Sequence, residues 1–368
     1  MQNALGQVLR ELPGPLLLTG HTGFKGTWMS FLLEHLNVPV VGYSLPAERD
    51  SLYDRAERTG AIPEAFADIR DREVLERFID LHKPSTIIHL AAQPLVLKSY
   101  ENPRDTFEVN VMGTVNLLDV AFKKDFVKAI IVVTTDKVYR NDNSGRAFVE
   151  TDPLEGKDPY SASKVGTEAV AAAWQQIAKS SGGPKIASVR AGNVIGGGDF
   201  AVNRIIPDLI RGVITGSPVE IRNPSSTRPW QHVLDPLLGY LITLESILRG
   251  LDLDAVNFGP VDSSMSVEEL VVEAKEVFPD KLKEVFPPSR ATQAIEASSL
   301  DLDSTFASEV LFWNPVWSQK QAIKKTFEWW KQLLDNGQEA KEIVREDVGS
   351  YLNNLNFKIN TAGSMNNG

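Results

Sequence analysis

The chain has 368 residues, of which 42% are hydrophobic and 23% are charged, as in a globular protein with a sizeable core. It has no cysteine, which excludes disulfides and thiolate chemistry, and its five histidines lack zinc-site spacing, so we expect no metal. A net charge of -10 argues against nucleic acid or an anionic membrane as a partner, because both require a basic face.

The first apolar run, residues 15–19, is too short for a signal peptide or a membrane span. It leads into a glycine-rich turn and not into a cleavage site with small residues. We therefore expect a cytoplasmic protein.

Short apolar runs then alternate with segments of helical periodicity as far as residue 195, which is the pattern of a parallel sheet covered by helices. The expected strands are residues 16–19, 38–43, 65–69, 86–90, 129–134 and 186–190. The expected helices are residues 27–36, 73–81, 106–122 and 163–178. Because the strands are apolar on both faces, we predict an α/β fold with a Rossmann-type doubly wound parallel sheet over residues 13–195.

After residue 195 the regular alternation weakens, several prolines follow, and an amphipathic stretch covers residues 267–278. We predict that residues 196–335 form a smaller, irregular C-terminal lobe over the carboxyl ends of the strands, with the chain crossing back to the first domain. Residues 353–368 are rich in Asn, Gly and Ser and are expected to be a disordered tail.

A glycine-rich turn, GHTGFKG, follows the first strand and opens the first helix. Its glycines allow the backbone to approach the pyrophosphate of a dinucleotide, which the N-terminus of the helix attracts. The turn predicts an NAD-binding first domain, although a glycine turn without a ligand is the alternative. The expected contacts come from Gly20, Thr22, Gly23, Phe24, Lys25 and Gly26.

The second strand ends without the acid that often holds the ribose of NAD. Ser44 or Arg49 could lie there instead, and Arg49 would suit a 2′-phosphate, so NADP stays open beside NAD. Asp68 and Ile69, at the end of the third strand, are placed to meet the adenine. Asp68 could equally cap the helix that begins near Asp71.

Tyr160 and Lys164 stand four positions apart at the start of a helix, so their side chains share one face. A nearby ammonium favours the phenolate, which could take a proton from a sugar hydroxyl while the carbon loses hydride. Thr135 follows the fifth strand at the edge where open α/β folds bind ligands, beside Asp136 and Lys137. A strand-end turn capped by Asp136 is the alternative for this segment.

These motifs, in this order, resemble the extended short-chain dehydrogenase/reductase family. Six segments resemble more narrowly its CDP-glucose 4,6-dehydratase branch, over roughly residues 13–334: HTGFKGTW, AAQPLV, NVMGT, TDK, RAGNVIGGGD and RPWQHVL. The resemblance implies a lyase with bound NAD that oxidises glucosyl C4, loses water across C5 and C6, and returns the hydride to C6. It also implies a homodimer.

The same resemblance implies roles for individual residues. Tyr160 would be the base at O4, supported by Lys164 and Thr135, while Asp136 would be the acid at the C6 hydroxyl. Lys137 would be the C5 base where relatives often have Glu, and it can serve only if it is kept neutral. Further cofactor contacts are expected from Ala91 and Ala92. Contacts to the nucleotide sugar are expected from Gln93, Asn193, Arg204, Arg228 and Gln231.

Three rival interpretations remain. A sugar-nucleotide 4-epimerase needs Thr135, Tyr160 and Lys164 but no acid for C6, and a dehydratase could act on a different nucleotide. A non-catalytic NAD-binding regulator is the third. Arg204 and Arg228 could also be surface arginines paired with carboxylates, and His232 is expected to be structural.

Overall fold

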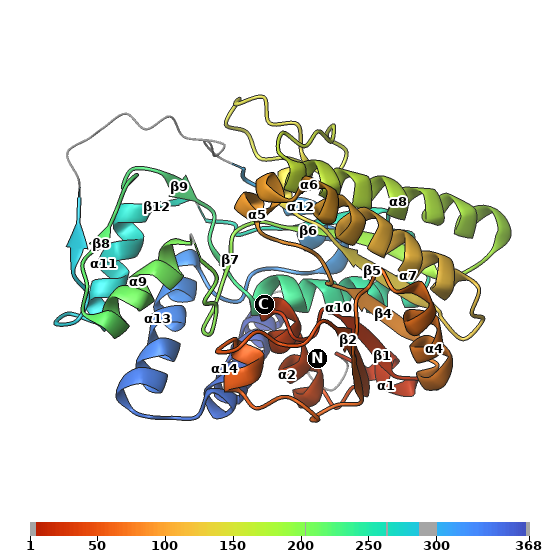
Figure 1. Cartoon of the computed structure of the whole chain (residues 1–368), viewed down its shortest axis with the longest axis horizontal. Helices are drawn as coiled ribbons and strands as arrows, with labels where there is room; N and C mark the ends of the chain where they lie inside the picture. Colours follow the sequence, from red (N-terminus) through yellow and green to blue (C-terminus); the bar gives the residue numbers. More distant parts are fainter. Residues whose placement is uncertain (1–4, 203, 263, 287–299, 366–368) are drawn as a thin grey trace.

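A seven-stranded parallel sheet lies at the centre of the computed structural model, which describes residues 5–202, 204–262, 264–286 and 300–365 (Figure 1). The strand order is β11-β6-β5-β4-β1-β2-β3. The strands are β1 (Leu16–Thr19), β2 (Val40–Ser44), β3 (Glu64–Phe66), β4 (Thr86–His89), β5 (Ala129–Val133), β6 (Lys185–Ala191) and β11 (Ala255–Phe258). The predicted Rossmann-type sheet is confirmed.

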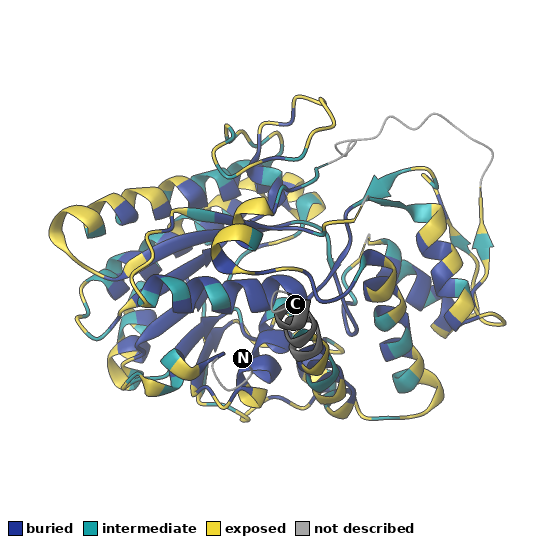
Figure 2. Ribbon diagram, turned by 180° about the vertical axis from the view of Figure 1, so that it is seen from behind, coloured by how far each residue is buried: buried dark blue, intermediate teal, exposed yellow. Residues whose placement is uncertain are grey.

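Alternate side chains of the strands enter two separate cores, one on each face of the sheet. Leu17 of β1 packs with Ile87 and Ile130 in one core, whereas Leu16 and Leu18 pack in the other. The first core is closed by α4 (Arg72–His82), α7 (Gly113–Phe122) and α8 (Pro159–Ser181). The second is closed by α2 (Phe24–His35) and α10 (Leu234–Leu248). Figure 2 shows the strands buried between these helices.

A smaller lobe stands beside the sheet, on the left of Figure 1. Its helices are α9 (Ile205–Thr215), α11 (Val267–Val277) and α13 (Gln319–Asp335). Its short strands pair as β7 (Val194–Ile195) with β10 (Gln231–His232), β8 (Val219–Glu220) with β13 (Glu284–Val285), and β9 (Thr227–Arg228) with β12 (Met265–Ser266). The sequence predicts a smaller, irregular lobe over residues 196–335, but α10 and β11 within this range pack with the central sheet.

The remaining elements are short, with one exception. They are α1 (Gln7–Glu11), α3 (Leu52–Arg55), α5 (Val96–Glu101), α6 (Pro103–Phe107), the π-helix η1 (Glu108–Met112), the 3-10 turn η2 (Asp136–Val138), α12 (Thr305–Leu311) and the long α14 (Ala340–Met365). No helix in the described part of the chain is both long and apolar enough to cross a membrane.

The seventh strand, β11, has no counterpart among the strands expected from the sequence. It has four residues, and Asn257 interrupts its apolar run. Asn257 is fully buried because its side-chain amide bonds the Tyr139 hydroxyl and the carbonyl of Phe148. A polar residue whose hydrogen bonds are satisfied by distant partners is therefore compatible with a buried strand at the edge of the sheet.

Two expected elements differ from the structure. The single helix expected over residues 106–122 is divided into α6, η1 and α7. The carbonyl of Asn110 in the π-helix accepts from Thr167 Oγ1 at 2.9 Å, which ties this segment to α8. Helix α14 runs on to Met365 past Asn353, where a disordered tail was expected. Its apolar residues up to Leu352 recur at helical spacing and are buried, and the helix packs on α2. Residues 366–368 lie outside the described residues.

Candidate active site

The glycine-rich turn lies at the carboxyl edge of the sheet, between β1 and α2. Gly20 has φ 71°, a conformation that favours glycine, and a Cβ there would lie 2.7 Å from the backbone nitrogen of Ala91. A Cβ on Gly26 would lie 2.1 Å from the Gly20 carbonyl oxygen. Gly23 is exposed, caps α2 without a side-chain hydrogen bond, and leaves the first amides of α2 available. The turn therefore fits the pyrophosphate of NAD.

We predict that Gly26→Ala destabilises the protein by about 1–3 kcal/mol and weakens NAD binding at least tenfold, because the methyl group overlaps the Gly20 carbonyl. Gly349→Ala is the matched control. Its Cβ would meet nothing closer than 3.8 Å, and alanine favours the helix. Denaturant unfolding with and without NAD measures both effects. Equal stability and NAD affinity in Gly26→Ala and wild type would contradict the prediction.

Side chains at the carboxyl end of β2 lie where the ribose and adenine of NAD would bind. Thr22 Oγ1 lies 2.8 Å from Ser44 Oγ, so these two hydroxyls stand where an acid is common. The side chain of Arg49 is 95% exposed to solvent, and its guanidinium lies beside the carboxylate of Asp50. Leu45 and Phe66 are exposed apolar side chains at the same edge, and sequence reasoning missed both.

Asp68 does not cap a helix. The N-cap of α4 is Asp71, which accepts from the amide of Val74, whereas Asp68 binds the guanidinium of Arg70 at 2.7 Å. The Ile69 side chain is buried in the core, so only its backbone is left to face a ligand.

The catalytic candidates meet between β5 and α8. Asp158 caps α8 and Pro159 opens it, which places Tyr160 and Lys164 in the first two turns. Tyr160, Lys164 and Thr135 are all more than nine-tenths buried. Thr135 is hydrogen-bonded to the Tyr160 hydroxyl. The ammonium of Lys164 donates to the carbonyl of Val133 at 3.1 Å.

Burial raises the pKa of Tyr160 to about 12, although the hydrogen bond with Thr135 and the charge of Arg204 oppose the rise. Burial also lowers the pKa of Lys164 to about 8, while the carboxylate of Glu168 works in the opposite direction. The protein by itself therefore does not produce the lowered phenol pKa expected from the Tyr160–Lys164 spacing, because Lys164 is directed at the strand end. A further cation has to favour the phenolate.

The two residues that distinguish dehydration from simple oxidation follow Thr135 in the turn η2. Asp136 is 3% exposed, and its Oδ1 accepts from Thr135 Oγ1 at 2.8 Å. Gly192 leaves room for it, since a Cβ there would lie 3.0 Å from Asp136 Oδ2. Lys137 is partly exposed, and its ammonium makes no hydrogen bond or ion pair within the described residues. An acid and an available amine thus stand beside the Tyr160 site.

Lys25 of the glycine-rich turn also contacts a helix on the other side of the site. Its Nζ donates to the hydroxyl of Tyr240 on α10 at 3.3 Å. Burial lowers the pKa of Lys25 to about 8, and the charges of Lys164 and Arg204 act in the same direction, while Asp136 opposes them. The cofactor turn and the catalytic cluster are therefore electrostatically coupled.

The expected substrate residues fall into two groups. Arg204 is 42% exposed, lies at the start of α9 and is paired with Asp199 at 2.8 Å, while Arg228 donates to Ser226 Oγ. Gln231 is buried, with its Oε1 lacking a partner among the described residues. Asn193 is partly exposed beside the catalytic edge.

Gln93, by contrast, uses its amide internally. The side chain bonds Leu95 and Thr106, and its backbone is held by Asn110. Asn110 also donates to the hydroxyl of Ser163 in α8 at 2.8 Å. Ala91 and Ala92, just before Gln93, are partly exposed at the end of β4. Gln93 therefore shapes the wall of the site through its backbone.

The histidines near this region are structural. His232 is fully buried between Trp28 and Trp317, and its Nδ1 accepts from the amide of Leu234. His89 lies 2.7 Å from Thr19 Oγ1, and burial lowers its pKa to about 3. Both imidazoles are therefore neutral supports. The described residues contain no cluster of acids and histidines that would suit a metal ion.

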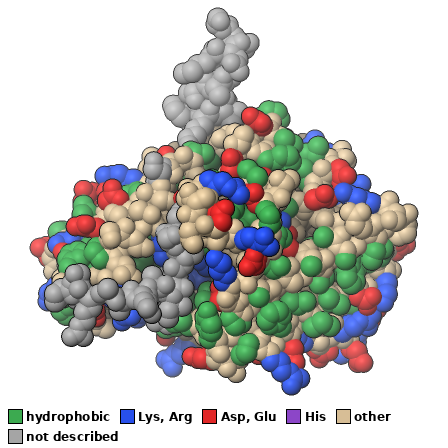
Figure 3. Space-filling view, turned by 90° about the horizontal axis from the view of Figure 1, so that it is seen from above, with side chains coloured by type: hydrophobic (Ala, Val, Ile, Leu, Met, Phe, Trp, Pro, Cys, Tyr) green, Lys and Arg blue, Asp and Glu red, His purple; other side chains and the backbone are tan. Residues whose placement is uncertain are grey.

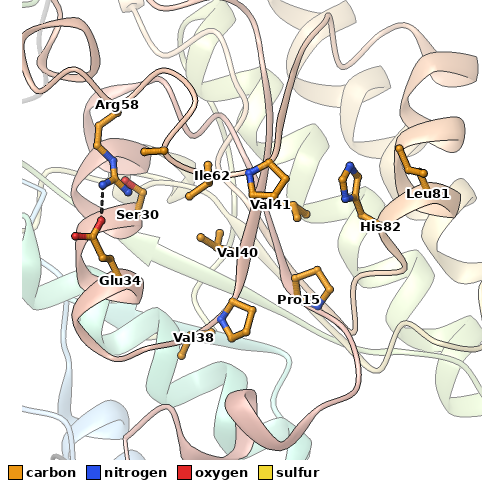
Figure 4. Close-up of a pocket in the computed structure, with 13 residues that line it drawn as sticks. Pro15, Ser30, Glu34, Val38, Val40, Val41, Arg58, Ile62, Leu81 and His82 are labelled. Atoms are coloured by element: carbon orange, nitrogen blue, oxygen red, sulfur yellow. Dashed lines mark hydrogen bonds and ion pairs between the residues drawn. The ribbon is translucent and has the colours of Figure 1, made fainter.

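A cavity of about 580 Å³ lies away from this site, at the amino edge of β1 and β2 (Figure 4). It is lined by Pro15, Val40 and Ile62 together with the ion pair of Arg58 and Glu34. None of the catalytic candidates lines it, so we do not assign it to the reaction.

Comparison with known families decides the classification. Residues 16–259 match the model of the NAD dependent epimerase/dehydratase family. The chain belongs to this family. It is 37% identical to the CDP-glucose 4,6-dehydratase of Salmonella typhimurium, over 92% of this chain and 96% of that one. It is 24% identical to the dTDP-glucose 4,6-dehydratase of Xanthomonas campestris, over 85% and 92%.

Solved structures support the same fold. The UDP-glucose 4-epimerase of Thermotoga maritima, solved with UDP-glucose, aligns with a TM-score of 0.76 at 24% identity. The alignment covers 87% of this chain and 100% of that one. The UDP-glucose 4-epimerase of Brucella ovis, solved with NAD, aligns with a TM-score of 0.73 at 20% identity over 85% and 97%. NAD is thus the cofactor of this family, as expected from the glycine-rich turn.

Proposed function

We propose that this protein converts CDP-D-glucose to CDP-4-keto-6-deoxy-D-glucose and water. The observation that supports the proposal most is the buried carboxyl of Asp136, which is hydrogen-bonded to Thr135 beside Tyr160. The chain that carries it is 37% identical to a CDP-glucose 4,6-dehydratase. Thr135, Tyr160 and Lys164 alone support oxidation of a carbinol, and the acid beside them adds elimination.

Each candidate catalytic residue acts on a particular atom of the sugar. The glycine-rich turn from Gly20 to Gly26 would hold NAD⁺, which would supply a reversible hydride acceptor for C4 oxidation. Tyr160 accepts the O4 proton, with Thr135 hydrogen-bonded to the reacting oxygen. The resulting C4 ketone acidifies the C5 proton, which Lys137 removes and returns to C5 when hydride is added at C6. Asp136 protonates the departing C6 hydroxyl, which leaves as water.

The nucleotide would be held at the lobe. Arg204 and Arg228 supply guanidinium groups for the diphosphate, in a chain of net charge -10 that needs local cations there. Asn193 and Gln231 offer amides, and the unpartnered Oε1 of Gln231 is free to accept a hydrogen bond from a ligand. At the other end, Leu45 and Phe66 form an apolar wall for the adenine of NAD.

The proposal is tested by incubating the protein with CDP-, dTDP-, UDP- and GDP-glucose and following the 4-keto product and the reduced cofactor. We expect the 4-keto-6-deoxy product with CDP-glucose. Product from another nucleotide alone would replace the proposed substrate. Inversion at C4 without loss of water would favour a 4-epimerase, and no C4 oxidation would favour a non-catalytic NAD-binding protein.

Lys137→Met should slow exchange of the C5 hydrogen with solvent by about 10²–10⁴-fold, because the base is lost. C4 oxidation should persist, since Lys137 touches neither Tyr160 nor Lys164 through a hydrogen bond. Lys157→Met, in the loop before α8, is the control. Exchange of the C5 hydrogen at the normal rate in Lys137→Met would remove this residue from the role of base.

We also propose a homodimer formed through the side of the molecule where α5, α6 and η1 meet α8. Four large apolar side chains on this side are 40–52% exposed: Leu97, Tyr100, Phe107 and Met112. Figure 3 looks onto the side on which α6 and α8 lie and shows hydrophobic side chains gathered there. Several large apolar side chains exposed on one side of a molecule are typical of an interface.

We expect Leu97→Glu combined with Met112→Glu to convert the dimer to a monomer, because two buried charges oppose association. Leu81→Glu, at a side chain that is 75% exposed on α4, should leave the dimer intact. Sedimentation equilibrium measures the mass of all three proteins. A monomeric wild type at micromolar concentration would rule out the dimer.

We propose a cytoplasmic location, as expected from the sequence. The cofactor and the substrate both carry charged phosphates, which do not cross a bilayer unaided. Fractionation of cells that produce the protein tests this.

A further inference from the structure

A buried ion pair lies directly behind the candidate catalytic residues. Glu168 and Arg190 are each about 95% buried, on α8 and β6 respectively. Arg190 donates from Nε and Nη2 to the two carboxylate oxygens of Glu168, at 2.8 and 3.0 Å. A bidentate pair of this kind has one defined geometry and needs a structural or functional reason to be buried.

The pair contacts both ends of the segment that carries Thr135, Asp136 and Lys137. Immediately before this segment in the chain, Thr134 Oγ1 donates to Glu168 Oε1 at 2.5 Å. Two residues after Lys137 in the chain, the hydroxyl of Tyr139 accepts from Arg190 Nη1 at 2.7 Å. One ion pair thus anchors the residue before this turn, Thr134, and the residue after it, Tyr139.

The rear anchor is itself fixed by other parts of the fold. The Tyr139 hydroxyl donates to Asn257 Oδ1 of β11 at 2.7 Å, and the Tyr139 ring stacks on Phe148 with centroids 5.1 Å apart. Burial raises the pKa of Tyr139 to about 12, so its hydroxyl keeps its proton. The Tyr139 hydroxyl therefore acts as a donor to Asn257 and as an acceptor from Arg190.

Glu168 also lies one helical turn after Lys164, on the same face of α8. Lys164 is surrounded by the carboxylate of Glu168 on its own helix, the carbonyl of Val133 on β5, His89 of β4 and Lys25 of α2. Glu168 is the anion among these groups. It therefore supports the charged form of Lys164.

We propose that Glu168, Arg190 and Tyr139 are positioning residues for the elimination, which hold Asp136 and Lys137 in register with the sugar bound at Tyr160. None of the three needs to touch the substrate. This inference rests on the proposed dehydratase function. Tyr139 would hold the C-terminal end of the segment that carries Asp136 and Lys137. Glu168 would hold the N-terminal end of that segment through Thr134 and would also keep Lys164 charged.

The conservative variant Tyr139→Phe removes one hydroxyl and keeps the ring on Phe148. In the full-length protein with bound NAD, CDP-glucose should still be oxidised at C4 within twofold of the wild-type rate. Formation of the 4-keto-6-deoxy product should fall at least tenfold, so the reduced cofactor accumulates in a single turnover. Loss of both steps to the same extent, or of neither, would overturn the proposal.

A second variant, Glu168→Gln, keeps the size of the side chain and removes its charge. We expect product formation to fall at least tenfold and the alkaline limb of the pH profile of C4 oxidation to move to lower pH, because Lys164 loses its anion. Asp254→Asn is the control, since it disturbs an exposed pair with Lys179 at the far end of α8. An unshifted profile in folded Glu168→Gln overturns the role of Glu168. If this variant does not fold, Tyr139→Phe decides.

The wild-type protein, measured in the same assay, distinguishes failure of the proposed function from failure of the positioning role. A wild type that oxidises C4 but forms no 4-keto-6-deoxy product contradicts the proposed function. A wild type that forms the product, beside variants that match it at every step, contradicts only the positioning role.

Discussion

Tyr160→Phe is expected to lower kcat by about 10²–10⁴-fold, because the variant cannot accept the O4 proton when the C4 hydride leaves. Only the hydroxyl is lost. The ring stays buried, and the backbone amide of residue 160 still donates to Ser99 Oγ at 3.1 Å. The rate of product formation and the absorbance of the reduced cofactor measure the effect, and both should fall together.

The control for this variant is Tyr100→Phe. Tyr100 is 52% exposed, and its hydroxyl makes no hydrogen bond within the described residues, so activity should stay at the wild-type level. The fraction of protein with NAD bound should be equal in the two variants. Activity of Tyr160→Phe within tenfold of wild type would exclude the phenol as the base.

The pH dependence of wild type follows from the same group. The phenol pKa is about 12 in the protein alone, and the reactive form is the phenolate. Since the phenolate fraction grows tenfold for each pH unit below the pKa, kcat/KM should rise with pH. It should level off well below pH 12 when a bound cation lowers the phenol pKa, and it should fall again where Lys164, with a pKa of about 8, loses its charge.

Asp136→Asn has the second largest expected effect. The amide has the same shape, and its oxygen can still accept from Thr135, but it has no proton to give to the departing C6 hydroxyl. Dehydration should fall by about 10²–10⁴-fold while C4 oxidation proceeds. The reduced cofactor should then accumulate with CDP-glucose and decay slowly, which stopped-flow absorbance resolves.

Asp142→Asn provides the comparison for this variant. Asp142 is an exposed residue of the loop after η2, and its carboxylate accepts a hydrogen bond from the nearby backbone amide of Ser144. We expect wild-type dehydration there. Normal product formation by Asp136→Asn would remove Asp136 from the role of acid and return the 4-epimerase to consideration.

Local patterns predicted those parts of the site that depend on neighbours in the chain. The glycine spacing sets a turn whose conformation only glycine tolerates, and the four-residue spacing of Tyr160 and Lys164 sets a shared helix face. Thr135 follows from the rule that ligands meet the carboxyl edge of a parallel sheet. These inferences need no knowledge of distant segments.

The network behind the site could not be predicted in this way. Arg190, Glu168 and Tyr139 lie on three elements, and Tyr139 bonds Asn257, 118 positions away. The direction of Lys25 also depends on Tyr240, 215 positions away. No periodicity records such pairings, because they arise only when the strands are ordered in the sheet.

The sequence by itself determined the Rossmann-type sheet, the cofactor turn and the set of reactive groups, because apolar periodicity and short spacings act within one element. The tertiary structure decided that Lys164 is directed at Val133, that the Gln93 amide is used internally and that β11 completes the sheet. Burial and long-range hydrogen bonds control these outcomes, and both exist only once the chain is packed.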